Sequence, residues 1–318
     1  MVYLEYCETL SFDQQRIPDA QILKGDVRFR HDSALMFCDS AYFYDKVNSL
    51  DAFGHVRMIQ GDTLAGYADK MYYDGNTKVV RFREHVRMTH KEDELTTDSL
   101  NYDRQCNIAY YFTTGTLRDT LNTLTSVFGQ YNTTTSQAQF RKNVELVNDQ
   151  FVLTSDTLDY NTDTKIADIV GPTEIVYDST TTILSTRGWY NTASQQSMLL
   201  QRSSIIHSDG MFMTGDTIYY DKQIGFGQVL SRMEMRDSTN KMTLRGDYGQ
   251  MYEQGHRGYA TRNALMIDWS DSANYAYIHA DTLFTEMVGE ENDTSSYRRV
   301  RAFFGVRLFR NDVQAVCD

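Results

Sequence analysis

The sequence contains only two prolines, Pro18 and Pro172, among 318 residues. Because proline cannot donate a backbone hydrogen bond, this scarcity suits long, uninterrupted β-ladders. No apolar run approaches the roughly 20 residues that a membrane-spanning helix needs. No signal peptide is visible, and we expect that one has been removed from the natural protein. The chain stops at Asp318, inside a recurring motif, so we also expect the natural chain to continue beyond it.

Cysteine and positive charge are also scarce. The four cysteines lie far apart and match neither a metal-ligand spacing nor a disulfide framework. Cys38 and Cys317 each directly precede a recurring aspartate position, so we predict that both are small, buried apolar residues. The net charge is −12 and no basic track is present. This composition argues against a nucleic-acid partner.

The chain is rich in strand-forming residues, and one motif recurs along it. The 22 tyrosines and 16 phenylalanines, together with many threonines, suit half-buried strands. Relatives of the segment Leu95–Asp103 return at steps of 29 to 37 residues. The positions equivalent to Asp98 are Asp39, Asp69, Asp98, Val127, Asp156, Thr186, Asp216, Asp247, Asp281 and Asp318. A fixed period of this size indicates a repeat architecture. We therefore predict a lead-in segment at 1–22 and a single elongated repeat domain at 23–318 of about ten units.

Each unit has the pattern of two strands joined by polar turns. Alternating segments such as Val27-Arg28-Phe29 and Val86-Arg87-Met88 predict strands with one buried and one wet face. Turns rich in Asp, Asn, Gly and Thr follow them, as at 74–77 and 161–164. No convincing amphipathic helix is present. The sequence therefore predicts an all-β fold built as a folded, two-walled ribbon.

The recurring motif contains a break in its alternation. Leu95 lies three residues before Asp98, whereas Leu100 and Tyr102 lie two and four residues after it. In one flat strand these apolar side chains would face opposite sides. A bulge or sharp bend at the aspartate would turn both sets toward one interior, and the Asp-Ser or Asp-Thr pair would cap backbone N–H groups there. A row of calcium-binding carboxylates is the weaker alternative. The predicted corner residues are Asp39, Asp69, Asp98, Asp156, Asp216, Asp247 and Asp281.

No catalytic or metal-binding constellation stands out, so the sequence does not predict an enzyme or a cofactor. The seven histidines form no short ligand pair, and the spacing of His55 and His85 is that of one repeat. Gly225-Phe226-Gly227 lacks the length and the strand-to-helix context of a phosphate-binding loop. An enzyme would need scattered carboxylates, as in the β-solenoid polysaccharide lyases.

The repeats instead build a long apolar interior. Most of its residues need be no more than core, but the many methionines would also adapt to irregular contents, as in a trough for acyl chains. The predicted lining residues are Val27, Phe29, Met36, Phe43, Val56, Met58, Met71, Tyr73, Val86, Met88, Leu95, Leu100, Tyr102, Val144, Leu146, Leu153, Leu158, Tyr160, Met213, Ile218 and Tyr220.

These motifs resemble those of the OstA/LptA-like family of lipopolysaccharide export, in particular the longer OstA-like periplasmic proteins of Bacteroides and relatives. The resemblance is carried by Gly25–Phe29 with Asp39-Ser40, and by Asn143–Leu146 with Asp156–Leu158, repeated in one register. It implies an antiparallel open β-jelly roll, or β-taco, that shields the acyl chains of lipopolysaccharide in the periplasm. It also implies end-to-end stacking with similar domains or with itself, and an outer-membrane assembly protein as partner.

Two other functions stay open at this point. One is a cell-surface β-repeat adhesin or glycan-binding module that uses exposed tyrosine rows. The other is a polysaccharide-active β-solenoid enzyme, which would need clustered charged side chains on one outer face. The backbone separates these readings, because a solenoid is a closed parallel coil and a trough is an open antiparallel ribbon.

Overall fold

The structure is a computed structural model, and it describes residues 1–13, 15, 17–177, 181–202, 204–208, 210–289 and 296–317. Asp318, the last member of the recurring series, lies outside these residues. Strands and tight turns dominate, with one short 3-10 helix, η1 (Asp45–Val47). The prediction of an all-β fold is confirmed.

The chain divides into two compact units, the first comprising residues 1–148 and 156–164 and the second residues 149–155 and 165–318. Strand β14 (Phe151–Asn161) contributes to both units. The first unit also contains β1 (Tyr3–Tyr6), β2 (Thr9–Phe12), β3 (Gln21–His31), β4 (Ala34–Tyr44), β5 (Ser49–Gln60), β6 (Leu64–Asp74), β7 (Val79–His90), β8 (Asp93–Asp103), β9 (Ile108–Tyr111), β10 (Gly115–Arg118), β11 (Thr123–Ser126), β12 (Phe128–Asn132) and β13 (Gln137–Val147). The second contains β15 (Ile166–Ile169), β16 (Thr173–Tyr177), β17 (Thr181–Ser185), β18 (Gly188–Asn191), β19 (Gln196–Leu199), β20 (Ile205–Ser208), β21 (Met211–Thr214), β22 (Thr217–Asp221), β23 (Phe226–Asp237), β24 (Met242–Tyr252), β25 (Arg257–Asp268), β26 (Ala276–Val288), β27 (Tyr297–Phe303), β28 (Val306–Arg310) and β29 (Val313–Cys317).

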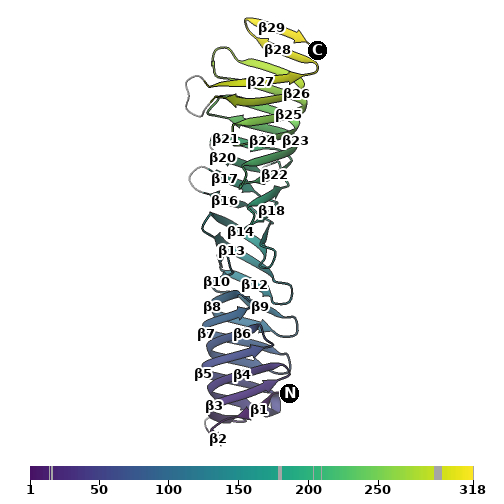
Figure 1. The fold of residues 1–318 in the computed structure, drawn as a ribbon. Helices are drawn as coiled ribbons and strands as arrows, with labels where there is room; N and C mark the ends of the chain where they lie inside the picture. The colour runs from purple at the N-terminus through teal and green to yellow at the C-terminus, as the bar shows by residue number, and fades with distance from the viewer. Residues whose placement is uncertain are drawn as a thin grey trace. The chain divides into compact units, whose positions relative to one another are not determined.

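Strands within each unit pair in an antiparallel sense. In the first unit, β3 to β8 form a meander in which each strand pairs with the next, and Figure 1 shows them side by side. In the second unit, β23 to β26 repeat this arrangement. The predicted lead-in carries β1 and β2, which pair with the two halves of β3. Because antiparallel pairing is incompatible with a parallel coil, the backbone removes the β-solenoid reading. The division into a lead-in and one repeat domain, and the number of units, stay predictions.

The long strands change face in the middle. The ladder between β7 and β8 shifts register between Arg83 and Val86, opposite Asp98. The two residues inside this step, Glu84 and His85, have φ angles of 66° and 48°, in the left-handed region. Two residues on one strand therefore oppose one on its partner, as in a β-bulge. As a result Leu95 and Leu100 are both buried although they lie at positions of opposite parity.

The same left-handed step recurs along both units, and we call this line the corner. Its members are Gly25-Asp26, Gly54-His55, Glu84-His85 and Lys142-Asn143 in the first unit, and Ser231-Arg232 and Arg262-Asn263 in the second. A non-glycine residue costs about 1–2 kcal/mol in this conformation. Gly54 avoids that cost at φ 74°, and a Cβ there would also lie 2.4 Å from Oδ2 of Asp39.

The seven predicted corner aspartates lie on the strand that faces this step. Six are exposed and Asp216 is half-buried. Three of them bond a side chain that lies sixteen residues later, on the second left-handed residue. Asp39 accepts a bond from Nδ1 of His55 at 2.7 Å, and Asp69 and Asp216 bond His85 and Arg232 in the same way at 2.6 Å. These bonds join side chains across the step, whereas the sequence predicted bonds to backbone N–H groups.

The two cysteine predictions have different outcomes. Cys38 is buried, as predicted, and burial raises the pKa of its thiol to about 12. Cys317 is exposed, so that prediction is wrong. It lies in β29, whose five residues are all exposed and which pairs, within the described residues, with β28 alone. One neighbouring strand cannot bury either face of such a segment.

The corner bonds predict a pH effect. The hydrogen bond to Asp69 raises the pKa of His85 above its ordinary value. This bond therefore contributes fully below the ordinary histidine pKa, and the contribution is lost as pH rises through the raised pKa. We expect an NMR titration of the ring to give His85 a pKa above 6.5. Asp69→Asn should return it toward that value and lower the pKa of His55 much less, because the hydrogen bond that raises the His55 pKa comes from Asp39. An unchanged His85 pKa in Asp69→Asn would contradict this assignment.

Candidate functional site: the enclosed interior and its mouth

The inward side chains of the two strand halves form two walls that face each other. All 21 predicted lining residues point into this interior, and the most exposed of them, Phe43, is 7% exposed. Seventeen belong to the first unit, and Leu153, Met213, Ile218 and Tyr220 belong to the second. The rings of Phe29 and Phe43, from opposite sides of the corner, lie 5.3 Å apart between centroids. Within each unit the lining residues therefore belong to the buried layer, while their contact with lipid stays a prediction.

The interior is filled by its own side chains. A Cβ added at Gly66, on one wall, would lie 2.7 Å from the ring of Phe82 on the other. In the second unit a Cβ at Gly258 would lie 2.7 Å from Cε of Met235. These close approaches require glycine, since any larger residue would push the walls apart. A guest can enter only if the walls separate or the side chains rearrange.

Methionine contributes much of this interior. Of the 14 methionines in the sequence, 11 are buried. Seven of them lie in the second unit: Met211, Met213, Met233, Met235, Met242, Met251 and Met266. Flexible thioethers adapt to irregular contents more readily than branched side chains do. The predicted lining included only Met213 of these seven and lacked Phe82 and Phe140, although alternation on the return strands could have located them.

The edge opposite the corner, where the turns of the two walls meet, is the mouth of the interior. Each long strand runs from a turn on one rim, over the corner, to a turn on the other. In the first unit the first rim carries the turns at 31–34, 60–64, 90–93 and 118–123. The second rim carries the turns at 44–49, 74–79, 103–108, 132–137 and 161–164.

Polar side chains bond across this mouth. His31 of the first rim lies 2.6 Å, through Nδ1, from the hydroxyl of Tyr73 of the second rim. Arg104 of the second rim donates to that same hydroxyl at 2.7 Å. It also donates to the carbonyl of His31 at 3.2 Å and to Oε1 of Gln60 at 2.7 Å. Burial lowers the pKa of His31, so the ring stays neutral near pH 7. This network closes the mouth over the interior.

A second network repeats this closure farther along the first unit. The hydroxyl of Tyr131 donates to Asp93 at 2.8 Å and lies 2.9 Å from Nδ1 of His90. Thr162 also donates to Asp93, at 2.7 Å. Burial lowers the pKa of His90 and raises that of Tyr131, so both stay neutral. Each buried polar group thus has a partner, and the bonds again join the two rims.

The second unit closes its mouth with bonds from cationic side chains. Lys222, in the turn after β22, donates to Oγ1 of Thr181 at 2.9 Å. Arg298, at the start of β27, donates to Asp237 at the end of β23 at 3.0 Å. Asp237 is almost fully buried and Arg298 largely so. A buried ion pair of this kind is costly to break on one side only.

One column of tyrosines links the apolar interior to this polar mouth. Its members lie four residues after successive recurring positions: Tyr73, Tyr102, Tyr131 and Tyr160 in the first unit, and Tyr190 and Tyr220 in the second. The rings are buried, while the hydroxyls bond rim residues such as Asn122 and Glu253. The sequence analysis treated four of these residues as apolar lining only. The recurrence of tyrosine instead of phenylalanine at this position could have predicted a polar rim, because a buried tyrosine hydroxyl needs a hydrogen-bond partner.

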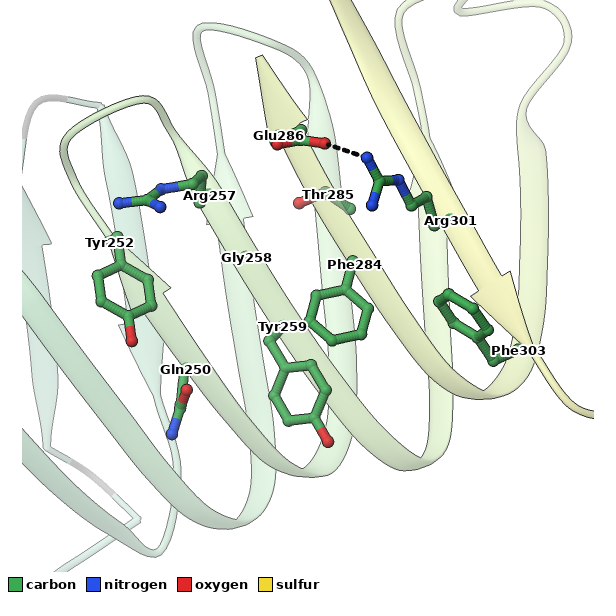
Figure 2. Close-up of a pocket in the computed structure, with 10 residues that line it drawn as sticks. All are labelled: Gln250, Tyr252, Arg257, Gly258, Tyr259, Phe284, Thr285, Glu286, Arg301 and Phe303. Carbon is green, nitrogen blue, oxygen red and sulfur yellow. Dashed lines mark ion pairs between the residues drawn. The ribbon is translucent and has the colours of Figure 1, made fainter. Parts of the chain in front are cut away.

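A shallow groove of about 320 Å³ lies on the outer face of the second unit, between β24 and β27. Figure 2 shows its aromatic side chains side by side on neighbouring strands. The ring of Phe284 lies 4.7 Å from that of Tyr259 and 6.0 Å from that of Phe303. An ion pair between Glu286 and Arg301, at 3.4 Å, borders the rings. This groove is separate from the interior, because its side chains point outward.

Two further searches of the described residues gave no site. No group of three or more His, Cys, Asp or Glu side chains is placed to hold a metal ion there. In the same part of the chain, no helix is long and apolar enough to cross a bilayer.

Comparisons with known proteins identify chains that are similar to this one. The sequence profile of a family described as OstA-like protein matches residues 1–156 and 142–206. A search of curated proteins found no match. Among solved structures, a similar chain is LptH, described as the LptA-homologous periplasmic component of the conserved lipopolysaccharide transport device from Pseudomonas aeruginosa. It shares 14% identity over 41% of this chain and 76% of its own length, with a TM-score of 0.20.

The ion pair at the second unit's mouth yields a stability prediction. Asp237→Asn leaves the Arg298 guanidinium largely buried without its counter-charge, so we expect the free energy of unfolding to fall by about 3–5 kcal/mol. Urea denaturation followed by circular dichroism measures this. The matched control is Arg245→Gln, which breaks an exposed pair with Glu234 and should cost at most about 1 kcal/mol. Equal effects of the two substitutions would refute the closing role of the buried pair.

Proposed function

This chain belongs to the OstA-like protein family, and from that membership we propose that it is a non-enzymatic carrier of lipopolysaccharide or a related lipid. In this proposal the acyl chains occupy the interior between the two walls, and the polar head group stays outside the mouth. The carrier works in the periplasm of a Gram-negative bacterium and forms part of a bridge toward the outer membrane.

The observation that carries the proposal is the enclosed apolar layer with a polar closure along one edge. Acyl chains are stabilised by removal from water, at about 0.8 kcal/mol for each buried CH₂ group. An interior lined by residues such as Leu100, Leu158 and Ile218 offers that environment along successive strands. The mouth bonds are polar and local, so they can exchange for bonds to a head group and to water. The walls therefore have a defined edge at which they can separate.

The ends of the sheet support association with similar domains. All five residues of β29 are exposed, including Val313 and Val316, and β29 pairs with β28 alone among the described residues. At the other end of the chain, all four residues of β2 are exposed, and β2 pairs with β3. Unpaired strand edges are templates for pairing with another chain. We therefore propose end-to-end contacts with other OstA-like domains, with a second copy, or with an outer-membrane assembly protein.

A second candidate function is glycan binding at the groove of Figure 2, because its exposed rings and bordering charged groups suit the apolar faces and hydroxyls of sugars. This reading predicts that Phe284→Ala with Phe303→Ala lowers affinity for an oligosaccharide at least about tenfold, measured by calorimetry. The matched control is Tyr110→Ala, an aromatic residue outside the groove. Unchanged affinity in the double variant would remove the glycan reading.

The carrier proposal is tested by site-specific photo-crosslinking. A hydrophobic photo-reactive residue placed at Leu100, Leu158 or Ile218 should crosslink to lipopolysaccharide in cells, because these positions face the interior. The control position is Arg87, whose side chain lies on the outer face over the ring of Tyr67. The expected result is lipid adducts at the three interior sites and none at the control. Adducts at Arg87 with silent interior positions would refute the proposal.

A further inference from the structure

Arg104 differs from the other cations of the mouth in the charge of its hydrogen-bond partners. Its side chain is 9% exposed, and its three hydrogen bonds go to Gln60 Oε1, the Tyr73 hydroxyl and the carbonyl of His31. All three partners are neutral. Among the described residues, no carboxylate lies within 4.0 Å of its guanidinium, the distance that defines an ion pair. Arg104 is thus a buried cation with no direct ion-pair partner, and Asp32 acts on it only from beyond ion-pair distance.

Other cations of the mouth have acidic partners. In the second unit, Arg298 lies 3.0 Å from Asp237 and Lys222 lies 3.8 Å from Glu253. On the first unit's own mouth, Lys91 is paired with Asp163 at 3.1 Å. Asp32, the acidic residue nearest in chain to His31, is paired with Lys78 at 2.7 Å. Among these described cations, Arg104 therefore differs in having no carboxylate within 4.0 Å.

A guanidinium buried without an anion is costly, and its planar fork matches the oxygens of a phosphate. Arg104 also lies at the mouth, between the apolar interior and the surroundings. We propose that Arg104 binds a phosphate group on the head of the lipid whose acyl chains fill the interior of the first unit. This inference rests on the proposed carrier function, because the chains must lie inside for the head group to reach the rim.

Lys78 provides a second positive charge near this site. Its ammonium pairs with Asp32, which is half exposed, so the pair can open toward an arriving anion. The neutral partners of Arg104 hold the guanidinium in place without competing for charge. A phosphate can then take bonds from N–H groups of Arg104 while Tyr73 keeps its ring in the interior. The site thus selects head groups that carry a phosphate over uncharged head groups with the same chains.

The test compares two lipids with identical acyl chains, an acylated diglucosamine with its phosphates and the same lipid without them. Binding is measured on the full chain by displacement of a fluorescent fatty acid. The native protein should bind the phosphorylated lipid about tenfold more tightly. Arg104→Gln should remove this preference, so that affinity falls more for the phosphorylated lipid than for the dephosphorylated one. Arg104→Lys keeps the charge without the fork and should retain part of the preference.

Controls separate the possible failures. Arg87→Gln, on the outer face, should behave as the native protein, and thermal unfolding shows that each variant folds. Equal loss of both lipids in Arg104→Gln would mean that Arg104 only holds the mouth closed, and would overturn the proposal. Binding of inorganic phosphate as tight as that of the lipid would overturn it in favour of a free-phosphate site. Equal binding of both lipids by the native protein refutes the phosphate site alone, whereas binding of neither refutes the carrier function.

Discussion

The left-handed step at the corner is the constraint on which the rest of the structure depends. Side chains of a β-strand alternate between its two faces, so a long straight strand buries only half of its apolar residues on one side. The step at Glu84-His85, and its equivalents along both units, put two residues opposite one, so that the facing strand changes the parity of its buried positions at its aspartate. Both halves then present their apolar side chains to one interior. Without the step, Leu95 and Leu100 would face opposite sides of the sheet.

Folding the strands over this line creates two edges with different chemistry. At the corner the long strands run through from one wall to the other. Three of the aspartates there bond histidine or arginine side chains, and such pairs near the surface add little to stability. Among the described residues, side chains join the walls at the mouth, and one of these bonds ends on a backbone carbonyl, that of His31. The tyrosine column fits this place because each ring extends the apolar layer and each hydroxyl reaches the polar rim. The mouth is therefore both the polar boundary of the interior and the edge held by the fewest backbone bonds.

The repeated backbone also allows the chemistry to vary along one line. The turn position six residues after each recurring position carries Arg104, Thr162, Lys222 or Glu253 in different repeats. Thr162 and Lys222 take part in closing bonds at the mouth, while Arg104 combines closure with an unbalanced charge. A single scaffold can thus hold a structural closure in one repeat and a recognition site in another. Because the side chains at the mouth vary between repeats, we expect the mouth, more than the core, to determine any specificity for a head group.

The sequence by itself determined the all-β class, the period, the burial of residues such as Leu100 and Cys38, and the need for a bend at the aspartate. Local alternation and composition carry this information, because they act between neighbours in the chain. Only the tertiary structure decided that the left-handed step lies on the facing strand, at pairs such as Glu84-His85 that bear no glycine or asparagine. It also decided that Cys317 is exposed and that His31, Tyr73 and Arg104 meet. These outcomes depend on which strands and rims come together, and residues more than forty positions apart leave no local pattern that predicts such contacts.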